Sequence, residues 1–365
     1  MLRCIAKNRC LLGLLILSGA TLVGVAPTLA QQQKPPSPLP VEIVTAWKNA
    51  GAQVGWLGPE TYGYPVFRFG EVGKQGEVPA FQFQEWRPGV LGRLPQPEYI
   101  FGLSLRNTKV TDDGMKELAG LKSLETLDLH NTQVTDAGLK ELAGLKSLRK
   151  LNFSFTRVTD AGLKALAELR SLHTLVLPTQ ITDVGLKELV GLNSLQTLHV
   201  SNTKVTDAGL KELAGLKSLR TLLLGHTKVT GAGLKELAGL QSLDLSSTQM
   251  SDTGMKELAG LKALQTLELA LTPITDIGLK EVAGLKSLRT LNLYNTRVSD
   301  TGLKELALLK TLKILDLGRT QVTDAGLMEL VGLKSLQEVT LFRTKVTAAG
   351  ADGLRKALPG SIIIH

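Results

Sequence analysis

The segment VTDAGLKELAGLKSLRKLNFSFT, residues 134–156, decides the fold of this chain, because close copies of it fill most of the 365 residues. One unit is short by one residue before Thr179, and another is short by three before Thr248. A fixed short period of this kind predicts a stack of repeated units instead of several independent domains. A threonine near the end of each copy recurs eleven times at intervals of 21–24 residues: Thr108, Thr132, Thr156, Thr179, Thr203, Thr227, Thr248, Thr272, Thr296, Thr320 and Thr344.

Each unit has the pattern of a short strand followed by a short helix. Leu151 and Phe153 alternate with polar residues as in a strand, and Leu139 and Leu142 share one face of a helix. One unit buries too few apolar side chains to offset the entropy of ordering its own backbone. The pattern therefore predicts an α/β solenoid in which the strands form a parallel sheet and the leucines of each unit pack against the next.

The polar residues that repeat in every unit are expected to be structural. Thr135 or Asp136 can accept the free amides at the start of the helix, and Gly144 fits a left-handed residue after its end. Thr132 follows the strand, where its hydroxyl is expected to bond the loop of the adjacent unit and so form a ladder along the array. A catalytic threonine is not expected, because no base accompanies it.

The consensus LxxLxxLxLxxTxVTDxGLKELAG, which runs from Ile100 to about Leu358, resembles the leucine-rich repeat family. It is most similar to the cysteine-containing and ribonuclease-inhibitor-like subclasses, including the substrate-recognition arrays of F-box proteins, and to an exported bacterial type. Threonine occupies the column where those subclasses carry cysteine or asparagine. The resemblance implies a right-handed horseshoe with a parallel sheet on the concave face and short helices on the convex face.

The first thirty residues have the features of a secretory signal. Basic residues up to Arg9 precede an apolar run over residues 11–25, and a small-residue site ends at Ala30. An uncleaved membrane anchor is the alternative. Cleavage would remove both cysteines, Cys4 and Cys10, and would leave a chain that is secreted, periplasmic or on the cell surface, with no membrane contact.

Both flanks of the array depart from the period. We expect residues 31–40 to be a Pro/Gln-rich linker, residues 41–99 to be an N-terminal cap with one helix and two short strands, residues 100–358 to be the repeat array, and residues 359–365 to form a C-terminal capping strand. The bulky side chains of the N-terminal cap are expected to cover the first core layer, with carbohydrate binding as the alternative; they are Trp47, Trp56, Phe67, Phe81, Phe83 and Trp86.

Function is expected on the concave face, where the side chains between the strand leucines point away from the core. Aromatic residues and arginines are favoured at binding hot spots, and they gather in the C-terminal third. The sequence therefore predicts a protein-binding site there, although exposed columns can also vary without a function. The candidate ligand-binding residues are Tyr294, Asp316, Arg319, Phe342 and Arg343.

Charge and motifs favour binding over catalysis. Removal of the signal would lower the net charge from +9 to +6, and this excess comes largely from the paired lysines on the solvated helix face, which is not a nucleic-acid groove. No phosphate loop, nucleophile elbow or HExxH motif occurs, so we expect no enzyme activity, no cofactor and no metal. Zinc held by His199, His226 and Asp244 is a minor alternative. The other functional alternatives are a cell-surface scaffold, a cell-envelope polymer as partner, and an F-box-like adaptor.

Overall fold

The computed structural model describes residues 37–59 and 64–365, and the expected signal segment lies outside this range. The strands are β1 Gln53–Pro59, β2 Pro65–Arg68, β3 Val78–Gln82, β4 Phe101–Ser104, β5 Leu124–Asp128, β6 Lys150–Asn152, β7 Thr174–Val176, β8 Thr197–His199, β9 Thr221–Leu223, β10 Ser242–Asp244, β11 Thr266–Glu268, β12 Thr290–Asn292, β13 Ile314–Asp316, β14 Glu338–Thr340 and β15 Ile362–Ile364.

The helices of the repeats are short and often continue as 3-10 turns. The α-helices are α1 Val41–Asn49, α2 Asp112–Leu118, α3 Asp136–Leu139, α4 Asp183–Leu186, α5 Asp207–Glu212, α6 Asp252–Met255, α7 Asp276–Val282, α8 Asp300–Leu306, α9 Asp324–Leu327 and α10 Ala348–Ala357. The 3-10 helices are η1 Leu91–Arg93, η2 Lys140–Gly144, η3 Asp160–Glu168, η4 Lys187–Leu189, η5 Leu213–Gly215, η6 Leu234–Leu237, η7 Lys256–Gly260 and η8 Met328–Gly332. Among the described residues, no helix is both long and apolar enough to cross a bilayer.

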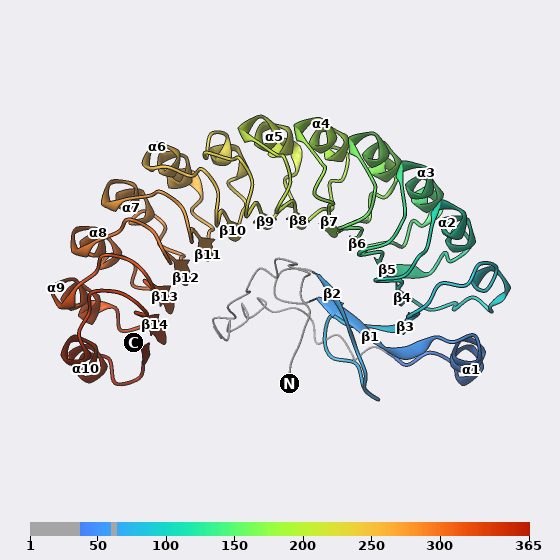
Figure 1. Cartoon of the computed structure of the whole chain (residues 1–365), viewed down its shortest axis with the longest axis horizontal. Helices are drawn as coiled ribbons and strands as arrows, with labels where there is room; N and C mark the ends of the chain where they lie inside the picture. The colour runs from blue at the N-terminus through green and yellow to red at the C-terminus, as the bar shows by residue number, and fades with distance from the viewer. Residues whose placement is uncertain (1–36, 60–63) are drawn as a thin grey trace, which may run out of the picture. The chain divides into compact units, whose positions relative to one another are not determined.

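All fifteen described strands belong to one open sheet, in the order β15 down to β3, then β1 and β2. Neighbouring strands from β3 to β15 are parallel, whereas β1 is antiparallel to both β2 and β3. Figure 1 shows the strands lining the inner side of the array and the helices covering its outer side. The predicted α/β horseshoe is therefore confirmed.

Equivalent leucines stack from unit to unit, which explains why the core is continuous. Leu267 of β11 pairs with Leu291 of β12, and Leu291 pairs with Leu315 of β13. All three side chains are fully buried. One cluster of buried residues runs from Leu39 in the N-terminal segment to Ile363 in β15, so each unit is stabilised by apolar burial against both neighbours.

The threonine column does not form the expected ladder between units. Thr132 Oγ1 donates to the carbonyl of Leu129, 2.7 Å away in its own unit. This bond closes the turn after the strand and places Asn131, which precedes the threonine, at a left-handed φ of 54°. The expectation for Gly144 was also wrong, because the left-handed residues lie in this turn and not after the helix.

The ladder between units is made by the aspartates instead. Both carboxylate oxygens of Asp136 accept from the next unit, one from the amide of Thr159 and one from its hydroxyl, each at 2.7 Å. Thr135 caps its own helix by accepting from the Ala137 amide at 3.3 Å, as predicted. The same ladder is made in the described residues by Asp112, Asp136, Asp160, Asp183, Asp207, Asp252, Asp276, Asp300 and Asp324.

The short unit before Thr248 lacks this aspartate. Gly231 takes its place, with a φ of 114°. Its unit has only the 3-10 helix η6 where most other units begin an α-helix with aspartate. The hydroxyl of Ser251, which has no carboxylate to meet, lies 2.8 Å from that of Thr253. The deletion therefore coincides with a local break in the ladder.

The aromatic residues of the N-terminal segment are mostly buried. The ring of Trp47 stacks on Phe81 at a centroid distance of 4.1 Å, and its indole nitrogen donates to the Pro95 carbonyl at 2.9 Å. Trp56 and Phe83 are also buried. The carbohydrate alternative is not supported for these rings, because a stacking platform must be open to solvent.

Candidate functional site

The concave face is built from the residues that flank the central leucine of each strand. From β10 to β13 one column of this face consists of Asp244, Glu268, Asn292 and Asp316, which are paired in register across adjacent strands. These side chains are half-buried, with part of their surface open to solvent. We call the concave residues of β10–β14 and of the turns that follow these strands the open strip.

Three of the five predicted site residues meet on the open strip. The guanidinium carbon of Arg319 lies 5.7 Å from the ring centroid of Tyr294, on the turn one unit away. Gly318 makes this approach possible, because a Cβ there would lie 2.9 Å from the Tyr294 ring and 3.1 Å from Asp316 Oδ1. Tyr294, Asp316 and Arg319 therefore form one continuous patch.

The other two predicted residues form a second pair on the next turn. The guanidinium carbon of Arg343 lies 5.1 Å from the ring centroid of Phe342, and the Phe342 side chain is 48% exposed. The two pairs are linked through the backbone, since the Arg319 amide donates to the Phe342 carbonyl at 2.8 Å. Arginine over an exposed aromatic ring is a cation–π arrangement that leaves both groups available to a partner.

Both arginines occupy a strained backbone conformation. Arg319 has a φ of 55° and Arg343 a φ of 56°, in the left-handed region that L-residues disfavour. Asparagine, which tolerates this region better, occupies the same column at Asn107, Asn131, Asn202 and Asn295. Phe155, His226, Ser247 and Leu271 are left-handed in the same column, so the turn is formed with many residue types and does not itself require arginine.

Burial raises the pKa of three carboxylates of the open strip, those of Asp244, Glu268 and Asp316. Burial, together with the charges of Asp244 and Asp316, raises the pKa of Glu268 to about 7, although a hydrogen bond from Asn292 opposes the shift. Burial also raises the pKa of Asp316 and of Asp244. A partner that brings a positive charge would favour the ionised forms of these carboxylates.

The strands nearer the N-terminus carry a contact that sequence reasoning missed. Tyr64, which immediately precedes β2, places its hydroxyl 3.0 Å from Nε2 of His199 on β8, with the two ring centroids 4.7 Å apart. Burial lowers the pKa of His199 to about 4, so the neutral ring can accept from the tyrosine. No local sequence signal could have revealed this contact, because 135 residues separate the two partners.

The zinc alternative gains no support from the structure. His199 uses its ring to contact Tyr64. In the described part of the chain, no three histidine, cysteine or acidic side chains are grouped so that they could hold a metal ion.

A hydrogen-bonded polar cluster lies on β5 and β6 and the turns that follow them. Asn152 donates to Asp128 at 2.9 Å, and the Ser154 hydroxyl donates to Asn152 at 2.7 Å. The same hydroxyl lies 2.8 Å from Nδ1 of His130. Burial raises the pKa of Asp128 to about 6 and lowers that of His130 to about 4. Although serine beside histidine can signal a nucleophile, Ser154 is only 4% exposed, so the cluster is structural.

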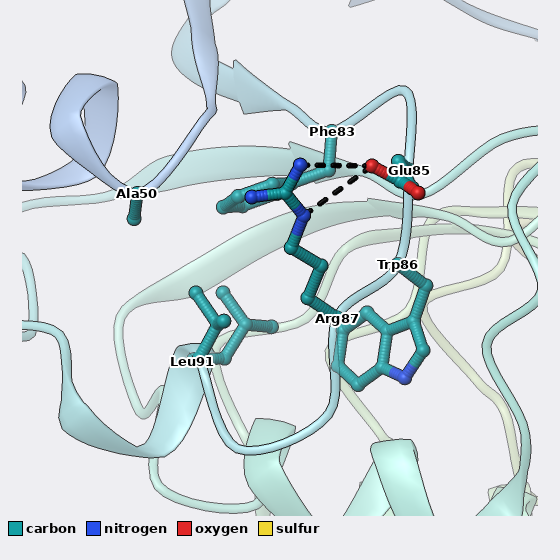
Figure 2. Close-up of a pocket in the computed structure, with 7 residues that line it drawn as sticks. Ala50, Phe83, Glu85, Trp86, Arg87 and Leu91 are labelled. Carbon is teal, nitrogen blue, oxygen red and sulfur yellow. Dashed lines mark hydrogen bonds and ion pairs between the residues drawn. The ribbon is translucent and has the colours of Figure 1, made fainter.

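Two pockets of the described residues are both small. Figure 2 shows one at the N-terminal segment, where Arg87 pairs with Glu85 at 3.0 Å beside Phe83, Trp86 and Leu91. It holds about 10 Å³, and a second pocket, between Leu216 and Glu236, holds about 120 Å³. Small-molecule sites usually enclose about 300–1,000 Å³, so the extended concave face is the better candidate for function.

Two family models, both described as leucine-rich repeat, match the array. One covers residues 234–298, and the other covers residues 120–143, 144–167, 191–214 and 309–331. Curated protein sequences include no match to the chain.

Solved structures of similar fold include two bacterial proteins and a chain from an octameric complex. An internalin of Listeria monocytogenes is 22% identical with a TM-score of 0.57, over 73% of this chain and 79% of its own. A leucine-rich repeat protein of Leptospira interrogans is 22% identical with a TM-score of 0.52, over 78% and 89%. A chain from an octameric complex of latrophilin 3, Unc5D and the leucine-rich repeats of FLRT2 is 19% identical with a TM-score of 0.54, over 74% and 85%. At these identities the likeness concerns the fold alone.

Proposed function

We propose that this chain, whose array matches leucine-rich repeat models in five segments, binds another protein through its concave face and carries out no reaction of its own. The observation that carries the proposal is the patch on the open strip, where Arg319 lies over Tyr294 and Arg343 over the exposed ring of Phe342. Aromatic residues and arginine contribute most of the binding energy in protein interfaces, and tyrosine and arginine offer both apolar area and hydrogen bonds.

Arginine at positions 319 and 343 is not required by the fold, which supports a role in binding. The same left-handed turn carries asparagine, phenylalanine, histidine, serine or leucine in other units. One of the structurally similar chains comes from an octameric complex in which the leucine-rich repeats of FLRT2 are assembled with domains of latrophilin 3 and Unc5D. Binding of a protein is therefore a use to which this fold is put.

We extend the proposal to location and organisation. A signal over residues 1–30 would direct the chain out of the cytoplasm as an exported bacterial type, and residues 31–40 would link it to a cap over residues 41–99. The buried stack of Trp47 on Phe81 supports the capping role, since it covers the core beside β4. Residues 359–365 would cap the other end, where β15 pairs with β14.

A capture experiment tests the proposal. Residues 31–365 are immobilised and exposed to envelope and secreted fractions, in parallel with a variant that carries Arg319→Glu, Phe342→Ala and Arg343→Glu. We expect a protein that the natural chain retains and the variant loses. The matched control carries Lys280→Glu and Lys304→Glu, which make the same change in net charge on exposed helix positions of α7 and α8.

The outcomes separate the alternatives. Equal loss of the protein from the variant and from the control would indicate a nonspecific charge effect and would contradict the proposal. Retention of the protein by the variant would move the site off the open strip. Retention of a polysaccharide instead of a protein would favour the envelope-polymer alternative, and no specific retention would favour the scaffold.

A further inference from the structure

The concave face is only partly available, because a segment of the chain lies on it. Strands β1 and β2 form a hairpin, paired from Trp56 with Arg68 to Pro59 with Pro65. Figure 1 shows the hairpin turning from the end of the sheet toward its concave side. Tyr64, which directly precedes β2, and Gly76, in the segment that follows the hairpin, contact repeat strands that are distant in sequence.

Two contacts anchor this segment. Tyr64 contacts His199 of β8 through its hydroxyl at 3.0 Å and through its ring. Farther along, Lys150 of β6 donates to the carbonyl of Gly76 at 3.1 Å. The loop between these anchors is held by Glu77, which pairs with Arg68 and accepts from the Lys74 amide at 2.6 Å. We call residues 64–77 the strap.

The surface beside Tyr64 is apolar and closed to solvent. Val176 of β7 and Leu223 of β9 flank His199 in register on the concave face. Val176 is fully buried and Leu223 is 2% exposed, although neither belongs to the main core cluster. The equivalent column of β10–β13 is polar and partly open. Burial of apolar side chains on a face that is elsewhere polar indicates a surface built to be covered.

We propose that the concave face over β7–β9 is a second binding surface, which the strap occupies in cis and uncovers reversibly. The strap then divides the concave face into a masked part and the open strip. The eleven strands β4–β14 span about 50 Å at the usual strand spacing, whereas the five strands of the open strip span only about 20 Å. Uncovering the surface would therefore extend the face that a protein partner can contact.

Cysteine labelling of residues 31–365, the chain expected after signal cleavage, tests this proposal. No partner is needed, so a negative result would not bear on the proposed protein-binding function. Val176→Cys is introduced alone and together with Tyr64→Ala, and modification of residue 176 by a small maleimide is followed by mass spectrometry. The hydrogen bond and the aromatic contact of Tyr64 together lead us to expect labelling roughly tenfold faster when Tyr64 is removed. Tyr64→Phe, which retains the ring, is expected to give an intermediate rate.

Two controls separate unmasking from unfolding. Asn292→Cys, on the open strip, should react at the same rate with and without Tyr64→Ala. Amide exchange of β12 should also be unchanged, since the strap does not contact it. Equal labelling of residue 176 with and without Tyr64 would overturn the proposal. Faster labelling that is accompanied by faster exchange in β12 would also overturn it, because the array itself would then have opened.

Discussion

Arg319 and Tyr294 lie on successive turns of the concave face, with the guanidinium carbon 5.7 Å from the centre of the tyrosine ring. The contact depends on two backbone features. Gly318 leaves room for the ring, and the left-handed conformation of Arg319 turns its side chain out of the strand. The protein thus maintains a strained arginine beside an aromatic residue at the place where a partner is expected.

Relieving the backbone strain at Arg319 should increase stability and weaken binding. We expect Arg319→Asn to raise the free energy of unfolding by about 0.5–1 kcal/mol, since asparagine tolerates a positive φ better. The same change should weaken binding of the captured protein by roughly tenfold. Phe155→Asn is the matched control, because Phe155 has a φ of 58° in the same column but follows β6 and so lies outside the open strip. It should stabilise the array and leave binding unchanged; equal binding by both variants would remove Arg319 from the site.

The aspartate ladder should contribute strongly to stability. Asp276 accepts from the Ser299 amide at 2.8 Å and from its hydroxyl at 2.6 Å. Asp276→Ala leaves both donors without their carboxylate, so we expect a loss of about 1–3 kcal/mol in urea unfolding. Asp113 pairs only with Lys116 on an exposed helix surface, and Asp113→Ala should have little effect. Equal effects of the two substitutions would contradict the role of the ladder.

Restoring the consensus residue should destabilise the protein at one position of the array. Gly231 stands where nine other units carry the ladder aspartate, and the substitution Gly231→Asp would restore the consensus. We expect this change to destabilise the protein by about 1–3 kcal/mol, because the residue has a φ of 114° and a Cβ would lie 2.8 Å from Met250 Sδ. Thermal unfolding of the single variant measures the effect, and a rise in Tm would show that the short unit can adopt the regular geometry.

The pH dependence of stability should reveal the raised pKa of Glu268, a half-buried carboxylate of the open strip. Burial raises the pKa of Glu268 from 4.5 to about 7, so the folded state holds this proton more tightly than the unfolded state does. The free energy of unfolding should therefore fall as the pH rises from 4.5 to 7, and the loss should be complete above pH 7.

Glu268→Gln removes that loss. The variant should match the natural protein near pH 4.5 and exceed it by roughly 1–2 kcal/mol at pH 8, after allowance for solvent screening. Urea unfolding at pH 4.5, 6 and 8 makes the comparison. Unfolding free energies that differ by the same amount at all three values would show that Glu268 titrates normally.

The repeat pattern predicts much of this structure because each leucine meets its equivalent in the next unit. Leu267, Leu291 and Leu315 pair in register, so one consensus is sufficient to predict both the strand and its neighbours. The polar residues are harder to predict from the same consensus. Thr132 and Asp136 both have local partners available in the sequence, yet the threonine bonds within its unit and the aspartate reaches the next one.

The strap could not be predicted because it lies outside the period. Tyr64 has no repeated equivalent, and its partner His199 is one of five histidines with no shared position. Strand alternation places His199 on the concave face, but only the path of the hairpin brings a tyrosine to it. The patch of Tyr294, Asp316 and Arg319 was predictable, since it follows from alternation and adjacent units alone.

Amide hydrogen exchange of the complex with the captured protein tests the central claim most directly. Binding to the concave face predicts slower exchange in the turns that carry Tyr294, Arg319 and Arg343, with no change in helices α7, α8 and α9 on the convex side. Protection confined to those helices, with the concave turns exchanging as in the free protein, would contradict the account.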